Sequence, residues 1–190
     1  QAERKAKERE RMRQLAKERE EREKKEREEE KARQEELKLN KEVVERSEKL
    51  SKKIERLSFG DLDDFEDFDI IETSKEKLNK RLKKLKAKEQ KAEDDIDLME
   101  IDEERQNIEE KHLSKIIPPL RRQIKTLNKR IDEANKALDN LNELEKKYKD
   151  SKFLPKKSIK DEFLKNLKDL KEQKSEKEKE LLSSENALDT

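Results

Sequence analysis

Leucine and isoleucine recur at alternating spacings of three and four residues along much of this chain, and this pattern constrains the fold most strongly. Heptad spacing places apolar side chains on one face of an α-helix, which a neighbouring helix must cover. The pattern is sustained over residues 113–141, and it also occurs, with interruptions, over residues 78–99 and 43–57. The predicted contact residues are Leu78, Leu82, Leu85, Ile96, Met99, Leu113, Leu120, Ile124, Leu127, Ile131, Leu138 and Leu141.

The composition favours long helices over a globular core. Charged residues make up 54% of the chain and hydrophobic residues 28%, whereas an average globular domain has roughly 25% and 45–50%. The 52 basic and 51 acidic residues nearly cancel, which fits charges paired along helices rather than the large net charge typical of disorder. We therefore predict an all-α protein with a long charged single helix, coiled-coil helices, a C-terminal helical hairpin and no globular core.

Interruptions of the pattern divide the chain into segments. Pro118 and Pro119 break the longest register because proline lacks a backbone N–H. The chain there either turns back or continues through a kink, and the unbroken register favours the kink. Thr73 and Glu76 form a capping box that predicts a helix start. The predicted segments are a charged helix with a short heptad segment (1–57), an acidic–aromatic linker (58–72), coiled-coil helices (73–117 and 118–149), a loop (150–157), a helix that packs back (158–183) and a tail (184–190).

The first 39 residues lack an apolar stripe, because Met12 and Leu15 are isolated. Opposite charges lie four residues apart instead, and each such pair contributes roughly 0.2–0.5 kcal/mol to a helix. This predicts a helix that needs no partner, which acts as a stiff spacer or as a rail for phosphates. The stretch resembles the KER-type single helices of myosins, caldesmon-like proteins and a histone-chaperone subunit. The predicted pairs are Glu3–Lys7, Glu18–Arg22, Glu20–Lys24, Glu21–Lys25, Glu23–Arg27 and Glu29–Arg33.

The segment 58–72, SFGDLDDFEDFDIIE, is the most informative for function. It combines large apolar side chains with carboxylates and contains no basic residue. Gly60 and the aspartates disfavour a helix, so we expect an exposed linker. Exposed aromatic side chains of this kind indicate a binding segment. The predicted partner-binding residues are Phe59, Leu62, Phe65, Phe68, Ile70 and Ile71.

The run DLDDFEDFD resembles acidic transcriptional activation peptides and the acidic–aromatic motifs of histone chaperones. The sequence Phe68-Asp69-Ile70-Ile71 is similar to the aromatic-x-x-aliphatic pattern that docks on ubiquitin-like autophagy modifiers. These resemblances imply docking on a partner, a basic one in the case of the histone chaperones. The alternative is intramolecular, because the basic run 75–88 follows directly and the phenylalanines could cover its leucine stripe. Both interpretations stay open.

Several chemistries are excluded or unsupported. The chain has no cysteine, and one glycine is too few for a phosphate-binding loop or a dinucleotide fingerprint. The single histidine, His112, is expected to be an ordinary surface or seam residue. We therefore expect no enzyme, cofactor or metal. No run approaches the ~18 apolar residues of a membrane span, so we expect an intracellular protein, cytoplasmic or nuclear, without a membrane partner. Because the chain begins at Gln1, we expect it to be part of a longer one.

These patterns predict a non-enzymatic scaffold that spaces and joins components of a larger protein assembly through homo- or hetero-oligomeric coiled coils. One alternative is a nuclear histone chaperone or transcription adaptor, in which residues 59–71 dock a basic partner. A second alternative is a rail whose basic faces bind nucleic acid or microtubules. The nearly balanced charge gives the rail less support, because contacts to a phosphate backbone require net positive surface.

Overall fold

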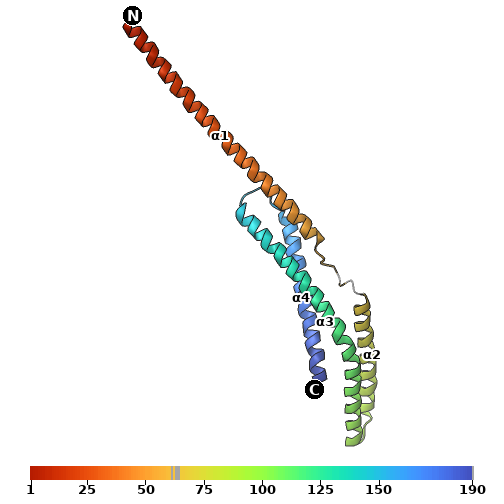
Figure 1. The fold of residues 1–190 in the computed structure, drawn as a ribbon. Helices are drawn as coiled ribbons and strands as arrows, with labels where there is room; N and C mark the ends of the chain where they lie inside the picture. Colours follow the sequence, from red (N-terminus) through yellow and green to blue (C-terminus); the bar gives the residue numbers. More distant parts are fainter. Residues whose placement is uncertain (61, 63–64, 190) are drawn as a thin grey trace. The chain divides into compact units, whose positions relative to one another are not determined.

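The computed structural model describes residues 1–60, 62 and 65–189, and these residues form helices without any strand (Figure 1). The helices are α1 (Ala2–Arg56), α2 (Phe65–Gln90), α3 (Asp95–Lys147) and α4 (Lys157–Asp189). The prediction of an all-α protein is confirmed. None of the helices in these described ranges is both long and apolar enough to cross a membrane.

The chain forms two compact units. The first comprises Gln1–Ser51 and Asn142–Pro155, and the second comprises Lys52–Leu141 and Lys156–Thr190. Helix α1 begins in the first unit, α3 begins in the second, and each of these two helices ends in the other unit.

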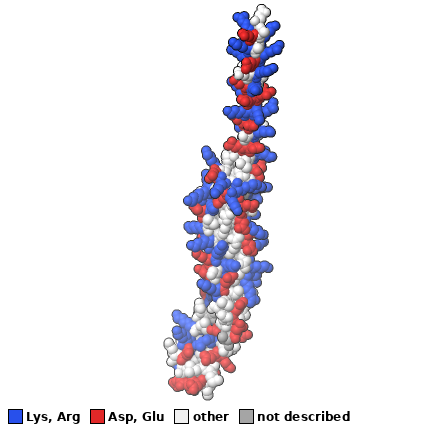
Figure 2. All heavy atoms as spheres, turned by 90° about the vertical axis from the view of Figure 1, so that its left-hand side faces the viewer, with Lys and Arg blue, Asp and Glu red and all other residues white. Residues whose placement is uncertain are grey.

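In the first unit, residues 2–39 of α1 are exposed along their whole length. Figure 2 shows basic and acidic side chains interspersed on this stretch. Burial begins where the heptad pattern begins, because Val43, Ser47 and Leu50 share one face and are all buried. The charged segment and the heptad segment of α1 therefore differ in their environment although the backbone between them is continuous.

The predicted charge pairs of residues 3–33 are not in direct contact. The described residues of α1 form an i,i+4 ion pair at another place, where Glu42 Oε1 lies 3.3 Å from Arg46 Nη2. The nitrogen–oxygen limit for an ion pair is 4.0 Å. Glu42 Oε1 also lies 3.8 Å from Lys147 Nζ. Exposed charges stay hydrated, and holding two long side chains in one geometry costs entropy that a surface pair barely offsets. The opposite charges of residues 3–33 are therefore neighbours on the helix surface, and no ion pair within 4.0 Å joins them in the described structure.

In the second unit, α2 and α3 form a hairpin that the sequence analysis missed. The amides of Lys91 and Ala92 donate to the carbonyls of Lys88 and Glu89, at 3.0 and 3.2 Å, and close α2. Asp94 Oδ1 then accepts a hydrogen bond from the amide of Asp97 at 2.8 Å and caps the start of α3. The predicted helix 73–117 is thus wrong. The turn contains no glycine or proline, so its signal was the capping aspartate and the acidic first turn of α3.

Helix α2 begins at Phe65, eight residues before the predicted start at Thr73. Residues 65–72, which the sequence placed in the linker, are therefore helical. Two effects outweigh the low helix propensity of aspartate here. Glu66 and Asp67 lie in the first turn, where carboxylates interact favourably with the positive end of the helix dipole. Ile71, one turn further on, is buried.

Helix α3 runs through Pro118 and Pro119, so the predicted division at residues 117/118 is wrong. Figure 1 shows the ribbon of α3 changing direction between the part that lies beside α2 and the part that follows. Proline removes a main-chain hydrogen bond and crowds the preceding turn, which bends a helix. The chain continues through this point and does not turn back.

Helix α4 lies along α3 in the second unit. Arg121 Nη2 lies 2.7 Å from Glu185 Oε1, and Lys177 Nζ donates to Gln123 Oε1 at 2.9 Å. Helix α4 continues to Asp189, so the predicted tail 184–190 is helical as far as the structure describes it. The last turns are ordered by burial, since Leu181, Ala187 and Leu188 pack against a cluster of buried residues. We call this the central cluster, and it comprises Ile71, Leu113, Ile116, Leu120 and Ile124.

A second group of buried residues, the hairpin cluster, consists of Leu85, Ile101 and Ile108, with Leu78, Leu82 and Ala92 packed against it. The packing of this hairpin cluster explains why two of the predicted contact residues in the 78–99 segment are exposed. Ile96 and Met99 are 67% and 69% exposed, because the turn breaks the register and α2 covers a different face of α3. Of the remaining predicted contact residues, Leu78, Leu82 and Leu138 are half-buried. The buried ones are Leu85, Leu113, Leu120, Ile124, Leu127, Ile131 and Leu141.

Candidate partner-binding surface

The predicted partner-binding segment lies in the second unit, where the chain enters α2. The connector before α2 is attached to both neighbouring helices. The ring of Phe59 meets the ring of Phe163 on α4 edge to face, with centroids 5.8 Å apart and an interplanar angle of 73°. The carbonyl of Gly60 accepts a hydrogen bond from Arg130 Nη1 on α3 at 2.9 Å. These contacts fix the start of the segment against the bundle.

An ion pair holds the first turn of α2 on α3. Arg122 Nη2 lies 2.6 Å from Asp67 Oδ1, and Arg122 Nε lies 3.1 Å from both carboxylate oxygens. The carboxylate of Asp67 is buried, with 6% of its side chain exposed, whereas 57% of the Arg122 side chain is exposed. Such a fork-like guanidinium pair fixes orientation as well as charge. One carboxylate of the predicted acidic–aromatic segment is therefore neutralised within the chain.

Ile71 belongs to the central cluster and is 4% exposed. Together with Phe59 it shows that part of the predicted segment packs within the chain. The packing differs from the intramolecular alternative given by the sequence, in which the segment folded back on the basic run 75–88. The contacts of Phe59 and Asp67 are instead with α4 and α3.

The remaining apolar side chains of the segment face outward. Phe68 is 52% exposed and Ile70 is 36% exposed. Leu62 is half-buried, and the side chain of Phe65 lies outside the described residues. Phe68 and Leu62 form one wall of a hollow of about 510 Å³, the corner groove. Its other walls come from Gln123 of α3 and from Gln173, Glu176, Lys177 and Glu180 of α4.

The polar wall of the corner groove is itself held in place. Lys177 is half-buried and donates to Gln123, as described above. Burial lowers the pKa of Lys177, while the carboxylate of Glu180 acts in the opposite direction and favours its charged form. Glu180 also pairs with Lys75 of α2. The groove therefore joins an apolar wall to a polar wall of fixed side chains, which suits an apolar anchor flanked by polar groups.

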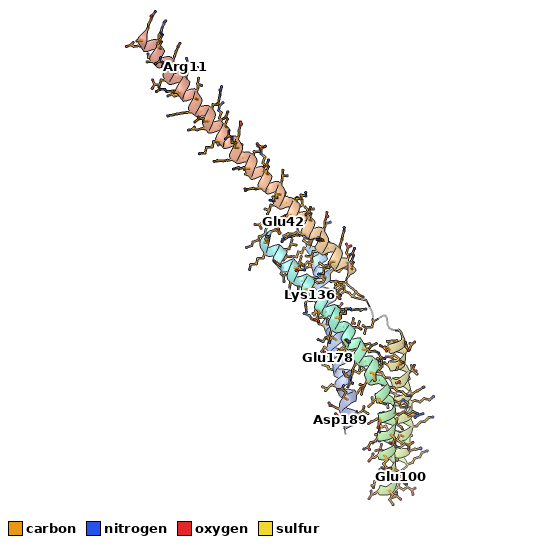
Figure 3. The ribbon with its side chains drawn as sticks, in the orientation of Figure 1. Arg11, Glu42, Glu100, Lys136, Glu178 and Asp189 are labelled. Carbon is orange, nitrogen blue, oxygen red and sulfur yellow. The ribbon has the colours of Figure 1, made fainter. Side chains whose placement is uncertain are left out.

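Helix α4 carries this polar wall over residues 173–180, and Figure 3 marks Glu178 on that stretch. Sequence reasoning found Leu62 and Phe68 from the acidic–aromatic composition, but it missed the α4 side. The α4 residues are ordinary charged helix residues, and only the packing of α4 on α3 brings them opposite Phe68.

His112, which the sequence predicted to be a surface or seam residue, is buried, with 1% of its surface accessible. Neither of its ring nitrogens has a hydrogen-bond partner among the described residues. Burial lowers its pKa, and the positive charges of Arg81, Lys111, Lys115 and Lys77 lower it further. Within the described part of the chain, no group of three or more His, Asp or Glu residues is arranged to hold a metal ion.

The geometry of this surface is thus a partly exposed aromatic side chain at the edge of a groove formed by three helices. Comparison of the chain with models of protein families, with curated proteins and with solved structures gave no match.

Proposed function

We propose that the protein is a non-enzymatic helical scaffold that joins components of a larger protein assembly, and that one partner docks in the corner groove. The observation that carries this proposal is the exposure of Phe68, 52%, at the edge of a hollow of about 510 Å³. Aromatic anchors seated in pockets contribute a large share of the energy of protein interfaces. Phe68 supplies such an anchor, or one wall of the pocket for an anchor of the partner.

The contacts around the groove support a preorganised surface. Phe59, Asp67 and Ile71 are each held within the chain, so Phe68 stands on a fixed helical turn. A surface that is already ordered loses less conformational entropy when a partner binds. This favours docking on the folded helix over binding by a flexible acidic peptide.

The charged stretch 2–39 fits the spacing role in the proposed scaffold. A helix of this length extends about 57 Å at a rise of about 1.5 Å per residue. Its exposure and its interspersed charges suit a rod that keeps attached components apart. Coiled-coil pairing with another chain is proposed for the heptad faces that the chain leaves exposed.

Crosslinking mass spectrometry on the native assembly tests the docking proposal. Lys75 and Lys177 border the groove and should form crosslinks to another protein. The substitution Phe68→Ala should remove these crosslinks, since the apolar anchor is lost. Phe153→Ala is the matched control, because Phe153 is 47% exposed and belongs to the other unit. Crosslinks that persist in Phe68→Ala, or that disappear equally in the control, would contradict the proposal.

A second candidate function is a histone chaperone or transcription adaptor that docks a basic partner. The specific observation in its favour is that Glu66 and Asp69 are exposed on either side of Phe68. Asp67 does not contribute, because Arg122 already pairs with it. The same crosslinking experiment discriminates the two candidates. A basic partner should lose its crosslinks steeply as the salt concentration rises, whereas an apolar contact should not.

A further inference from the structure

A second surface lies on the first turns of α3, away from the corner groove. The face of α3 that carries Leu113 and Leu120 belongs to the central cluster, which includes Ile71 of α2 and against which Leu181 and Leu188 of α4 pack. Counting back from Leu113 in the same heptad register gives Glu110, Gln106, Glu103, Met99 and Ile96. Figure 1 shows this first part of α3 continuing past the end of α4, beside α2. The heptad stripe of α3 therefore continues onto turns that lie beyond the end of α4.

The extension of the stripe is apolar at its far end and uncovered. Ile96 and Met99 are 67% and 69% exposed. Helix α2 covers the other side of these turns, where Ile101 and Ile108 are 8% and 9% exposed. These two large apolar side chains lie one turn apart on the same face of α3. Further along the helix this face is an interface, but here it has no partner.

The segment of α3 that carries this face is acidic. The run 93–104, EDDIDLMEIDEE, contains no basic residue. Glu100 and Glu103 lie four residues after Ile96 and Met99, which places each carboxylate next to an exposed apolar side chain. Neither carboxylate forms an ion pair within the described chain, and Figure 3 places Glu100 at the end of the α2–α3 hairpin. A partner that covers the apolar pair must meet these charges, so it needs basic residues beside its own apolar stripe.

We propose that this face of α3, centred on Ile96 and Met99, binds a lysine- or arginine-rich amphipathic helix of a partner protein. The helix lies along α3 in the position that α4 occupies further on, with apolar residues on Ile96 and Met99 and basic residues on Glu100 and Glu103. This site is separate from the corner groove, and it does not depend on Phe68.

The test uses the full chain and two fluorescent peptides of about three heptads. Both carry isoleucine and leucine at the seam positions, and one has lysine at the flanking positions where the other has glutamate. The lysine peptide should bind, as measured by fluorescence anisotropy, and the glutamate peptide should bind at least tenfold more weakly. Equal binding of the two peptides, or no binding of either, would overturn the proposal.

Paired substitutions locate the site. Ile96→Ser together with Met99→Ser should weaken binding of the lysine peptide at least tenfold. Both side chains are largely exposed, so the helical circular dichroism of the variant should equal that of the original chain. The matched control is Met12→Ser on α1, where methionine is also 69% exposed, and it should bind as the original chain does. Undiminished binding by the double variant would place the peptide elsewhere and reject the site.

Sedimentation of the chain alone tests whether this face of α3 binds a second copy of the same chain instead. We expect the same mass for the original chain and for the Ile96→Ser, Met99→Ser variant. If the original chain dimerises and the variant does not, the face pairs with another copy and the assignment to a basic helix is wrong. The outcome of the Phe68 crosslinking experiment does not affect these binding measurements. Docking in the corner groove and helix binding at Ile96 and Met99 can therefore be rejected independently.

Discussion

Helices α1 and α3 have nearly the same length, 55 and 53 residues, but differ in how much of each helix is buried. The first 39 residues of the chain, nearly all in α1, are exposed, whereas α3 buries apolar residues repeatedly from Ile101 to Leu144. We expect residues of high helix propensity to specify the first stretch locally. Contacts with other helices specify α3. A helix of the first kind tolerates change at most positions, whereas a helix of the second kind depends on particular residues.

The difference also concerns how charges are used. Along residues 3–33 the opposite charges stay hydrated and do not close into pairs. On α3, Arg122 and Arg105 pair with carboxylates at 2.6 and 2.8 Å. The partner carboxylates, Asp67 and Glu89, belong to α2. Charges between helices therefore fix how helices sit on one another, and charges along a single helix do not.

The largest expected effect comes from truncating a leucine in each stretch. Leu120→Ala should lower the free energy of unfolding by about 2–5 kcal/mol, because it leaves a cavity at a fully buried position. Leu15→Ala, at a position 54% exposed, should change it by less than about 0.5 kcal/mol. Urea unfolding followed by circular dichroism measures both. A large loss for Leu15→Ala would mean that the first stretch is packed, and it would abolish the distinction.

A smaller effect distinguishes the two uses of charge. Asp67→Ala should cost roughly 1–2 kcal/mol, since a buried acceptor is lost while the half-exposed Arg122 can be rehydrated. Glu23→Ala should cost at most about 0.5 kcal/mol, the value of one i,i+4 neighbour on a helix. The same urea experiment serves for both. Equal costs would show that the hydrated charges of α1 stabilise as much as the ion pair between α2 and α3.

The smallest effect is a dependence on pH that arises from α3. The pKa of His112 in the folded protein lies below its ordinary value of about 6.5. As the pH falls below about 6.5, the unfolded chain therefore takes up the proton before the folded protein does. The contribution of His112 to the free energy of unfolding should decrease until the pH passes the folded-state pKa, and should be constant above neutral pH.

His112→Leu provides the comparison for this prediction. It removes the titrating ring together with its two unpartnered nitrogens, so the variant should lose less stability than the original chain between about pH 7.5 and about pH 5.5. Urea unfolding at both pH values measures the difference, and carboxylates common to both proteins cancel. An identical loss in the two proteins would show that the pKa of His112 is the same in the folded and unfolded states.

The sequence predicted the all-α class and most of the buried positions from Leu113 to Leu141, because a regular apolar spacing needs no knowledge of the partner. It missed the turn at residues 91–94 and predicted a continuous helix there. A turn without glycine or proline looks like continuing helix, and the heptad count ran through it onto Ile96 and Met99. The one local signal was Asp94 followed by an acidic first turn, which is weak in a chain with so many aspartates and glutamates.

For the candidate surface, composition identified the segment but not which side chains face outward. Phe68 and Ile71 are three residues apart in one acidic run, yet one is exposed and the other lies in the central cluster. Their difference depends on α2 starting at Phe65 and on Asp67 meeting Arg122. Both are consequences of packing against α3, which no local pattern in residues 58–72 encodes.

The two prolines inside α3 have a mechanical consequence. Without amide hydrogens at Pro118 and Pro119, the carbonyls of Ser114 and Lys115 lose the donors that an unbroken helix would provide. Helix α3 should therefore bend most easily there, next to Leu120 and the central cluster. A load applied along α3 should be absorbed as bending at this one place, while the turns on either side keep their shape.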